Sequence, residues 1–188
     1  MNESRGRGSA GFDQRGAIMH SVRSLAMASA ALLLAAAIPQ TAQAREMVGF
    51  NEAYSSGTIV VKTAERKLYY VLGNGQAIRY PVGVGRAGKQ WSGTARIDGK
   101  QLSPAWAPPA EIRRDKPSLP AVIPGGAPTN PMGAAAMTLS GGEYAIHGTN
   151  QPSSIGGFVS YGCIRMLNAD VLDLYNRVSW GAPVVVVR

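Results

Sequence analysis

Prolines and glycines interrupt this chain so often that long helices are excluded from its middle. The 188-residue sequence holds 23 glycines and 12 prolines, and residues 86–142 contain most of the prolines. These prolines are Pro104, Pro108, Pro109, Pro117, Pro120, Pro124, Pro128 and Pro131. A proline inside a helix removes a hydrogen-bond donor and clashes with the preceding turn. We therefore expect residues 86–142 to form short strands carried on long ordered loops, where substrate sites often lie on a β scaffold.

Runs of β-branched and aromatic residues lie ahead of this segment. They occupy residues 58–62, 67–72 and 76–85, and the sequence Gly73-Asn74-Gly75 separates the last two runs. Such runs, broken by Asn-Gly and glycine-rich turns, are typical of a meander of short strands. The N-terminal part of the domain is therefore predicted to be β.

The C-terminal part combines two strands and a helix. Residues 143–146 indicate a strand that delivers His147 at its end. Residues 168–178 carry apolar side chains at the spacing of a one-sided helix, with Asn168 as the expected N-cap. The β-branched run at 183–187 favours a strand covered on both faces. The whole pattern predicts a mainly β domain, sandwich-like or barrel-like, with one helix in its C-terminal half and long Pro/Gly-rich loops.

The first 44 residues have the pattern of a secretory signal peptide. Arg15 and Arg23 precede an apolar run at 25–38 that is short for a bilayer span, and Ala42-Gln43-Ala44 resembles a cleavage site. A start at Met19 would give a more conventional signal. An uncleaved membrane anchor is the alternative.

Cleavage after this segment would leave a flexible lead-in over residues 45–56 and a single domain over 57–188. We expect the mature protein to be exported to the periplasm or cell envelope, with no stable membrane insertion, and to be a monomer. The full chain has a formal net charge of +8, and residues 45–188, with 15 Lys and Arg against 9 Asp and Glu, have +6, which suits an anionic polymer such as cell wall. Because the Lys and Arg residues are scattered and not clustered, no nucleic-acid partner is expected.

Cys163 is the only cysteine in the chain, and His147 is the only histidine after residue 44. A lone cysteine in an exported protein is buried and inert, paired with another chain, or kept as a reactive thiol. A thiol needs a base or an ion-pair partner to become a nucleophile near neutral pH. Gly162 allows a tight turn, so backbone N–H groups near Cys163 are candidates for an oxyanion hole.

These residues lie in a longer pattern that resembles a known family. The sequence His147-Gly148-Thr149 is followed by a Pro-x-Ser-Ile-Gly-like stretch and then by Ser160-Tyr161-Gly162-Cys163-Ile164-Arg165-Met166. This is similar to the signature of the L,D-transpeptidases of the YkuD (ErfK/YbiS/YcfS/YnhG) family, and the similarity extends to residues 80–86 and 104–109. The resemblance covers roughly residues 57–188. It implies a β-sandwich-like exported enzyme that acts on peptidoglycan stem peptides.

The resemblance also implies roles for residues. Cys163 would be the nucleophile and His147 its base or imidazolium partner, with the Gly148 carbonyl holding the other ring N–H. The thiol would attack the amide between the third and fourth residues of a tetrapeptide donor, D-alanine would leave, and an amine of a second stem would accept the acyl group in a 3→3 cross-link. Such chemistry requires no metal and no cofactor.

One position departs from the family pattern. Members usually have histidine before the Gly-Cys pair, and this chain has Tyr161, whose phenol can donate a hydrogen bond but carries no positive charge near neutral pH. We place Tyr161 with Ser160, Gly162 and Arg165 on the substrate and oxyanion side of the site. Ser160 could equally fix a turn. Arg165 could bind a substrate carboxylate or backbone carbonyls.

Three tryptophans are expected to be core or lid residues. They are Trp91, Trp106 and Trp180, and Trp106 in its Pro-rich setting could line a groove.

Alternatives of two kinds stay open at the level of sequence. Within enzymes, water as acceptor would make the chain an L,D-carboxypeptidase, and other nucleophiles would make it a lipoprotein-attaching or D-amino-acid-exchanging enzyme. From a different class, a catalytically silent wall-binding module fits the basic charge and Tyr161. A binding module has no need for a lone thiol in an oxidising compartment, which favours the enzyme.

Overall fold

The computed structural model describes residues 45–188. The expected signal peptide, its cleavage site and the alternative start at Met19 lie outside the described residues. Within the described range, no helix is long and apolar enough to cross a membrane.

The described chain forms eleven strands, two α-helices and a short 3-10 turn. The strands are β1 (Glu46–Gly49), β2 (Ile59–Lys62), β3 (Lys67–Gly73), β4 (Gln76–Pro81), β5 (Val84–Gly85), β6 (Gly93–Leu102), β7 (Ala135–Leu139), β8 (Ala145–His147), β9 (Phe158–Ser160), β10 (Ile164–Arg165) and β11 (Pro183–Val187). The helices are α1 (Ala110–Asp115) and α2 (Asn168–Arg177), and the 3-10 turn is η1 (Pro152–Ser154). The mainly β prediction is confirmed.

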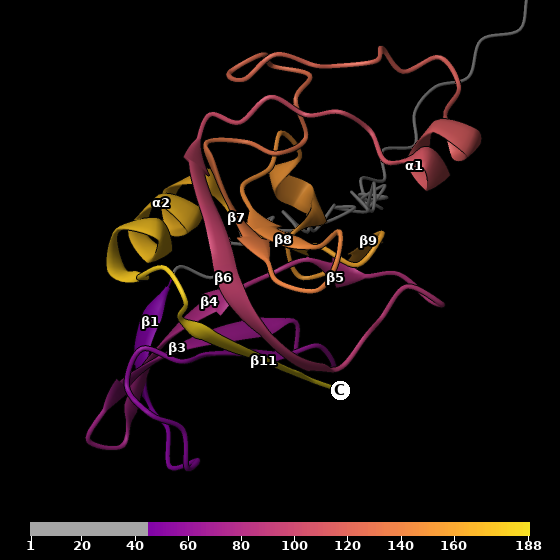
Figure 1. Ribbon diagram of the computed structural model, residues 1–188. Coiled ribbons are helices and arrows are strands. Elements are labelled where there is room, and N and C mark those ends of the chain that lie inside the picture. The colour runs from indigo at the N-terminus through magenta and orange to yellow at the C-terminus, as the bar shows by residue number, and fades with distance from the viewer. Residues whose placement is uncertain (1–44) are drawn as a thin grey trace, which may run out of the picture. The chain divides into compact units, whose positions relative to one another are not determined.

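Strand β6 joins the two halves of the main sheet. Nine strands lie in the order β1-β4-β3-β2-β11-β6-β7-β8-β10, and β5 pairs with β9 separately. The first residues of β6 pair with β11, whereas those from Ile97 onward pair with β7. A register shift between Ile97 and Gly99 separates these pairings, and a Cβ at Gly99 would lie 2.3 Å from Thr138 Oγ1. The strand therefore continues past β11 to β7 and β8, as Figure 1 shows.

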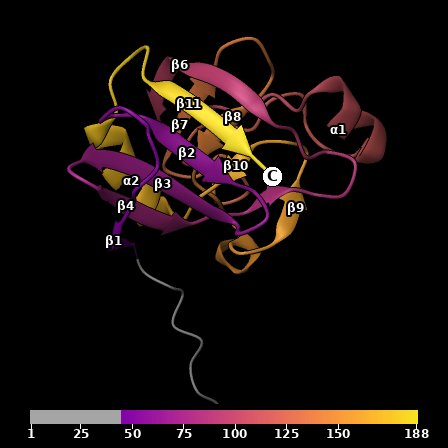
Figure 2. The same cartoon turned by 90° about the horizontal axis from the view of Figure 1, so that it is seen from below.

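The core lies between these two parts of the sheet. Leu68, Ile97, Met137 and Ile146 are fully buried in one cluster, and α2 adds Leu174 to it while packing against β7 and β8. Figure 2 shows β2 beside β11, with β3 and β4 following in turn. The arrangement is sandwich-like, and the sheet does not close into a barrel.

The expected C-terminal strand is present, but it is not covered on both faces. β11 is central in the sheet, parallel to β2 and antiparallel to β6. Val184 and Val186 are buried, whereas Val185 and Val187 are only half-buried. A continuous β-branched run thus predicted the strand correctly and its burial wrongly.

Three other features differ from the sequence-based expectations. The Pro-rich segment contains helix α1, because Pro109 and Pro117 bracket its six residues without interrupting them. The same segment also contains a ten-residue strand, β6, where short strands were expected. The expected flexible lead-in contains β1, which pairs antiparallel with β4, and Phe50 after it is buried.

Candidate active site

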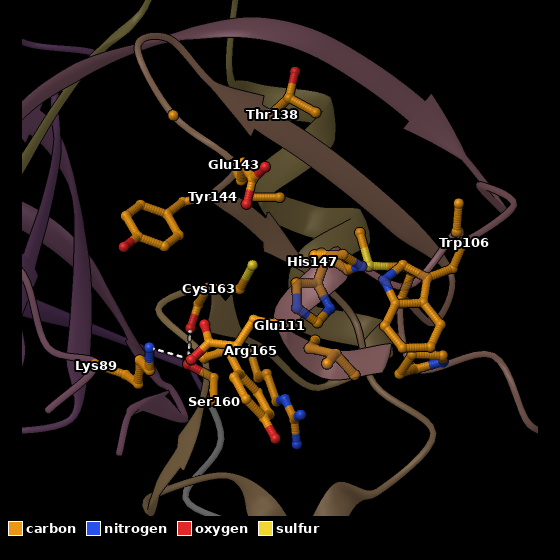
Figure 3. Close-up of a pocket in the computed structure, with 18 of the residues that line it drawn as sticks. Lys89, Trp106, Glu111, Thr138, Glu143, Tyr144, His147, Ser160, Cys163 and Arg165 are labelled. Carbon is orange, nitrogen blue, oxygen red and sulfur yellow. Dashed lines mark hydrogen bonds and ion pairs between the residues drawn. The ribbon is translucent and has the colours of Figure 1, made fainter. Parts of the chain in front are cut away.

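Two short parallel strands bring the expected site residues to one face. In the register of β8 and β10, Arg165 pairs with His147 and Ile164 pairs with Ile146. Both isoleucines are buried in the core, so alternation along the strands turns His147 and Arg165 to the opposite face. Cys163, two residues before Arg165, shares that face, and all three line one pocket of about 550 Å³ (Figure 3).

The geometry of His147 fixes its tautomer. The ring is buried, and its Nδ1 lies 2.7 Å from the carbonyl oxygen of Gly148. A carbonyl can only accept a hydrogen bond, so Nδ1 carries the proton and Nε2 is left as an acceptor. The sequence resemblance implied this contact with Gly148.

Burial keeps the His147 ring neutral. Loss of solvation, followed by the positive charge of Arg165, lowers the pKa of His147 to about 4. The backbone carbonyls of Gly148, Pro131 and Met132 act in the opposite direction and raise this pKa in part. Near neutral pH the ring is therefore a base, and those carbonyls favour the imidazolium once a proton arrives.

The Cys163 thiol is also protonated at rest. Burial raises its pKa, although a hydrogen bond from the Ala145 backbone and the charge of Arg165 lower it in part. The residue keeps some exposure towards the pocket. Burial thus favours the uncharged form of both groups, a thiol and a neutral imidazole that line the same pocket.

Asn168 orients the Gly148 carbonyl that holds His147. Its Oδ1 accepts hydrogen bonds from the backbone N–H groups of Ala134 and Thr149, each at 3.0 Å. The Thr149 N–H belongs to the same planar peptide as the Gly148 C=O, so fixing one fixes the other. A Cβ at Gly133 or Gly148 would lie 2.2 or 2.3 Å from this Oδ1, so glycine is required at both positions.

We expected Asn168 to be the N-cap of the following helix, and this was wrong. The N-cap of α2 is Leu167, which makes no side-chain cap, and Asn168 is the first residue of the helix. The sequence signal, an asparagine at a helix start, was real. Its partners are backbone groups of two distant loops, which no local pattern specifies.

Ser160 braces the turn before the nucleophile. Its Oγ donates to the Cys163 carbonyl at 2.6 Å and accepts from the Gly162 N–H at 3.1 Å. Of the two roles left open for Ser160, the structure contains the turn-fixing one. Since the Gly162 N–H is bound to Ser160, the Cys163 N–H is the better candidate for an oxyanion donor.

Gly162 is required by both conformation and space. Its φ is +126°, a region that other residues rarely adopt. A Cβ there would lie 2.2 Å from Cε1 of the Tyr144 ring. Tyr144 thus covers the turn that carries Cys163.

Arg165 carries a buried nitrogen without a partner. Within residues 45–188, its Nε is buried and makes no hydrogen bond. Burial lowers the pKa of this guanidinium, and the nearby Cys163 acts in the opposite direction. The alternative in which its Nε binds backbone carbonyls is not observed in this part of the chain.

The hydroxyl of Tyr161 is bound away from the oxyanion side of the site, where we expected this residue to act. Its hydroxyl donates to Asp115 Oδ2 at 2.6 Å, and the Arg86 guanidinium lies 4.0 Å from the centre of its ring. Arg86 also pairs with Asp115 at 3.1 Å. Tyr161 lines the pocket, but its hydroxyl is engaged with α1 and not with the oxyanion side of the site.

The wall formed by α1 is held by polar contacts. The helix contributes no buried residue, and Glu111 forms an ion pair with Lys89 across the pocket edge, which Figure 3 marks with a dashed line. Both residues line the pocket. This wall is therefore less firmly packed than the strands opposite it.

The three tryptophans have different places. Trp106 lines the pocket, as the groove hypothesis suggested. Trp91 packs against the core and donates its Nε1–H to the Gly162 carbonyl at 2.9 Å. Trp180 is 67% exposed, so the expectation of a core or lid position was wrong for it.

No group of three or more metal-binding side chains lies close together among residues 45–188.

Comparison with known proteins gives one consistent result. Residues 56–186 match the sequence model of a family described as the L,D-transpeptidase catalytic domain, YkuD. The probable L,D-transpeptidase YbiS of Escherichia coli K12 is 42% identical over 135 residues, which are 67% of this chain and 43% of that protein. The probable L,D-transpeptidase ErfK/SrfK of the same organism is 41% identical over 138 residues, again covering 43% of its length. The chain thus spans less than half of these curated relatives.

Solved structures share the fold. An L,D-transpeptidase from Mycobacterium smegmatis superimposes with a TM-score of 0.57 at 18% identity, covering 71% of this chain and 59% of that one. L,D-transpeptidase 3 from Mycobacterium tuberculosis, in complex with a faropenem-derived adduct, gives a TM-score of 0.53 at 17% identity over 71% and 60% of the two chains.

Proposed function

The chain belongs to the YkuD family of L,D-transpeptidase catalytic domains, and from this premise we propose that it is a cysteine-dependent acyltransferase that forms 3→3 cross-links in peptidoglycan. The observation that carries the proposal is the shared face of Cys163 and His147, with the ring held by Gly148 in the tautomer that leaves Nε2 free as a base.

The first half-reaction is acylation of the thiol. Cys163 Sγ attacks the carbonyl between the third and fourth residues of a tetrapeptide stem as its proton passes to His147 Nε2. The carbonyl oxygen becomes an oxyanion, and the Cys163 N–H is the proposed donor to it. His147 then returns the proton to the leaving amine, D-alanine departs, and a thioester remains.

The second half-reaction transfers the acyl group. An amine of a neighbouring stem attacks the thioester carbonyl and loses a proton to His147. The C–S bond breaks, the sulfur takes that proton back, and a new amide joins the two stems. The proton that leaves with D-alanine is replaced by the one that the acceptor amine loses, so the thiol and the neutral imidazole are both restored and the cycle needs no cofactor.

A resting thiol and neutral imidazole suit this sequence of steps. His147 gives its proton to the leaving amine in the first half-reaction, so the neutral ring is again available as a base for the incoming amine. The pKa of about 4 for His147 keeps the ring ready to accept a proton at each attack.

Arg165 is the proposed anchor for a substrate carboxylate. Its half-buried guanidinium lines the pocket, and its Nε has no partner within residues 45–188. Guanidinium and carboxylate pair in a bidentate geometry, and peptidoglycan stems carry free carboxylates. Peptidoglycan lies outside the cytoplasmic membrane, so the protein must be exported to the periplasm, which is the role of the proposed signal peptide. We propose that it acts there as a monomer.

Defined muropeptides test the proposal. The protein is incubated with purified disaccharide-tetrapeptide, and the products are weighed by mass spectrometry. A dimer lighter than two substrates by one D-alanine is the expected product. Tripeptide and free D-alanine without dimer would instead identify an L,D-carboxypeptidase.

Two variants complete this experiment. Cys163→Ala and Cys163→Ser should be folded and inactive, because the thiol does the chemistry and adds little buried surface. Unchanged conversion by Cys163→Ala would contradict the whole mechanism. No conversion by the parent protein, together with a thiol that alkylates only in denaturant, would favour a silent wall-binding module.

A further inference from the structure

Trp91 approaches the nucleophile from behind, outside the substrate pocket. Its Nε1–H donates to the Gly162 carbonyl at 2.9 Å, across 71 positions of sequence. Trp91 is absent from the lining of the main pocket and lines a smaller neighbouring hollow of about 170 Å³. It therefore contacts the turn that carries Cys163 without reaching a substrate in the main pocket.

The Gly162 carbonyl that Trp91 contacts belongs to the same peptide as the Cys163 N–H. The Gly162 C=O and the Cys163 N–H are parts of one planar trans unit, in which the C=O and N–H bonds point in opposite directions. A donor that holds the carbonyl on one side consequently aims the Cys163 N–H to the other side. That N–H is the candidate oxyanion donor, since the Gly162 N–H is bound to Ser160.

The turn needs such a restraint from outside. Gly162 has a φ of +126°, and glycine resists rotation of its neighbouring peptides less than any other residue. Ser160 bonds to the Gly162 N–H and the Cys163 carbonyl, which belong to the peptides on either side of the 162–163 peptide. The indole N–H thus restrains the 162–163 peptide, to which the Ser160 hydroxyl makes no bond.

A stacked pair keeps the indole in place. The Trp91 and Tyr144 rings are stacked with centroids 5.2 Å apart, and Tyr144 also lies against Gly162. The stack presents the Nε1–H to the turn with little rotamer freedom.

We propose that Trp91 is a positioning residue for acyl transfer, which aims the Cys163 N–H at the oxyanion by holding the Gly162 carbonyl. The inference rests on the proposed function, because it assumes that Cys163 attacks an acyl carbonyl. It assigns Trp91 no contact with substrate and no effect on the thiol itself.

Two reactions of the same sulfur separate these roles. Acylation by a β-lactam develops an oxyanion at the attacked carbonyl, whereas alkylation by iodoacetamide displaces iodide and develops none. Trp91→Phe keeps an aromatic ring for Tyr144 and removes only the N–H donor. Trp180→Phe is the matched control, because it removes an indole N–H from an exposed position.

Both rate constants are measured by intact mass for the parent and the two variants. Trp91→Phe should acylate about tenfold more slowly and alkylate within about twofold of the parent. Trp180→Phe should match the parent in both reactions. Equal acylation by Trp91→Phe would overturn the inference while leaving the proposed function standing, and an equal fall in both reactions would show an effect on the thiol or the fold.

The hydrogen bond of Trp91 can also be tested on the parent protein, without any variant. Hydrogen exchange at the Trp91 Nε1–H, followed by NMR, should be much slower than at the exposed Trp180. Equal exchange rates would contradict the hydrogen bond itself. A parent protein that is never acylated would overturn the proposed function together with the inference.

Discussion

The two sides of the pocket are built in opposite ways. Cys163 and His147 are carried by paired strands whose alternate residues are buried in the core, and backbone or short polar contacts fix each of them. Helix α1 on the other side contributes no buried residue and is held by Asp115 and Glu111 through exposed contacts. The reacting groups are therefore carried by the firmly packed strands. The α1 side has no buried residue, so substitutions there should change the stability of the fold little.

The largest expected effect follows from removing the base on the rigid side. His147→Ala should reduce acylation of Cys163 by about 10²–10⁴-fold, which is the usual contribution of general-base assistance. Acylation rates by intact mass, at pH 5 to 9, measure this. Because His147 stays neutral down to about pH 4, the parent should lose no activity near pH 6.5 from titration of this ring. A parent profile that falls at pH 6.5 and becomes flat in His147→Ala would contradict the assigned environment.

The buried imidazole should also appear in the stability of the fold. The folded pKa of about 4 lies below the unfolded value of 6.5, so the unfolded chain takes up the proton first as the pH falls. Stability should therefore decrease from pH 6.5 to pH 4, by about 3 kcal/mol from this group. Urea unfolding of the parent and of His147→Asn at pH 7 and pH 4 measures the difference. An equal loss of unfolding free energy in the parent and in His147→Asn would contradict the lowered pKa of His147.

Asn168 tests whether backbone orientation matters on the rigid side. Asn168→Leu removes the acceptor for the Ala134 and Thr149 N–H groups and should slow acylation about tenfold. Asn168→Asp keeps an oxygen acceptor and should recover most of the rate. The pH dependence of acylation should shift in the Leu variant alone, because only there is the Gly148 carbonyl free to turn from His147. Identical profiles in the two variants would reduce Asn168 to a structural residue.

The smallest effect is expected on the α1 side. Tyr161→Phe loses the hydrogen bond to Asp115 but keeps a ring beneath Arg86, so acylation should fall by less than about tenfold. Tyr161→His should be active with a changed pH profile, because a second titrating imidazole then lines the pocket. Acylation rates against pH for both variants and the parent decide this. If Tyr161→Phe were as inactive as His147→Ala, the Cys163 sulfur would depend on the Tyr161 phenol, and the α1 side of the pocket would carry the chemistry.

Sequence patterns predicted the rigid side better than the other. The β-branched runs, the lone cysteine and the lone described histidine identified strands and chemical groups, because each is encoded locally. The partners of those groups were not encoded locally. Trp91 reaches Gly162 across 71 positions and Tyr161 reaches Asp115 across 46, and such contacts depend on the assembled sheet.

The Pro-rich segment shows a second limit. Proline density excluded long helices correctly, yet α1 fits into the six residues between Pro109 and Lys116, and β6 extends over ten residues before the first proline of the segment. A rule that counts prolines over a window overlooks the short intervals between them. Helix α1 carries Asp115 and Glu111, so this omission concealed the wall that Tyr161 contacts.

Acylation of the parent protein by a penem or carbapenem is the most direct test of the central claim, that the rigid face presents Cys163 as an acyl-accepting nucleophile. Intact-mass analysis of the native protein should show one drug adduct, peptide mapping should locate it on Cys163, and Cys163→Ala should show none. An adduct on another residue, or no adduct at high drug concentration on folded protein, would contradict the account.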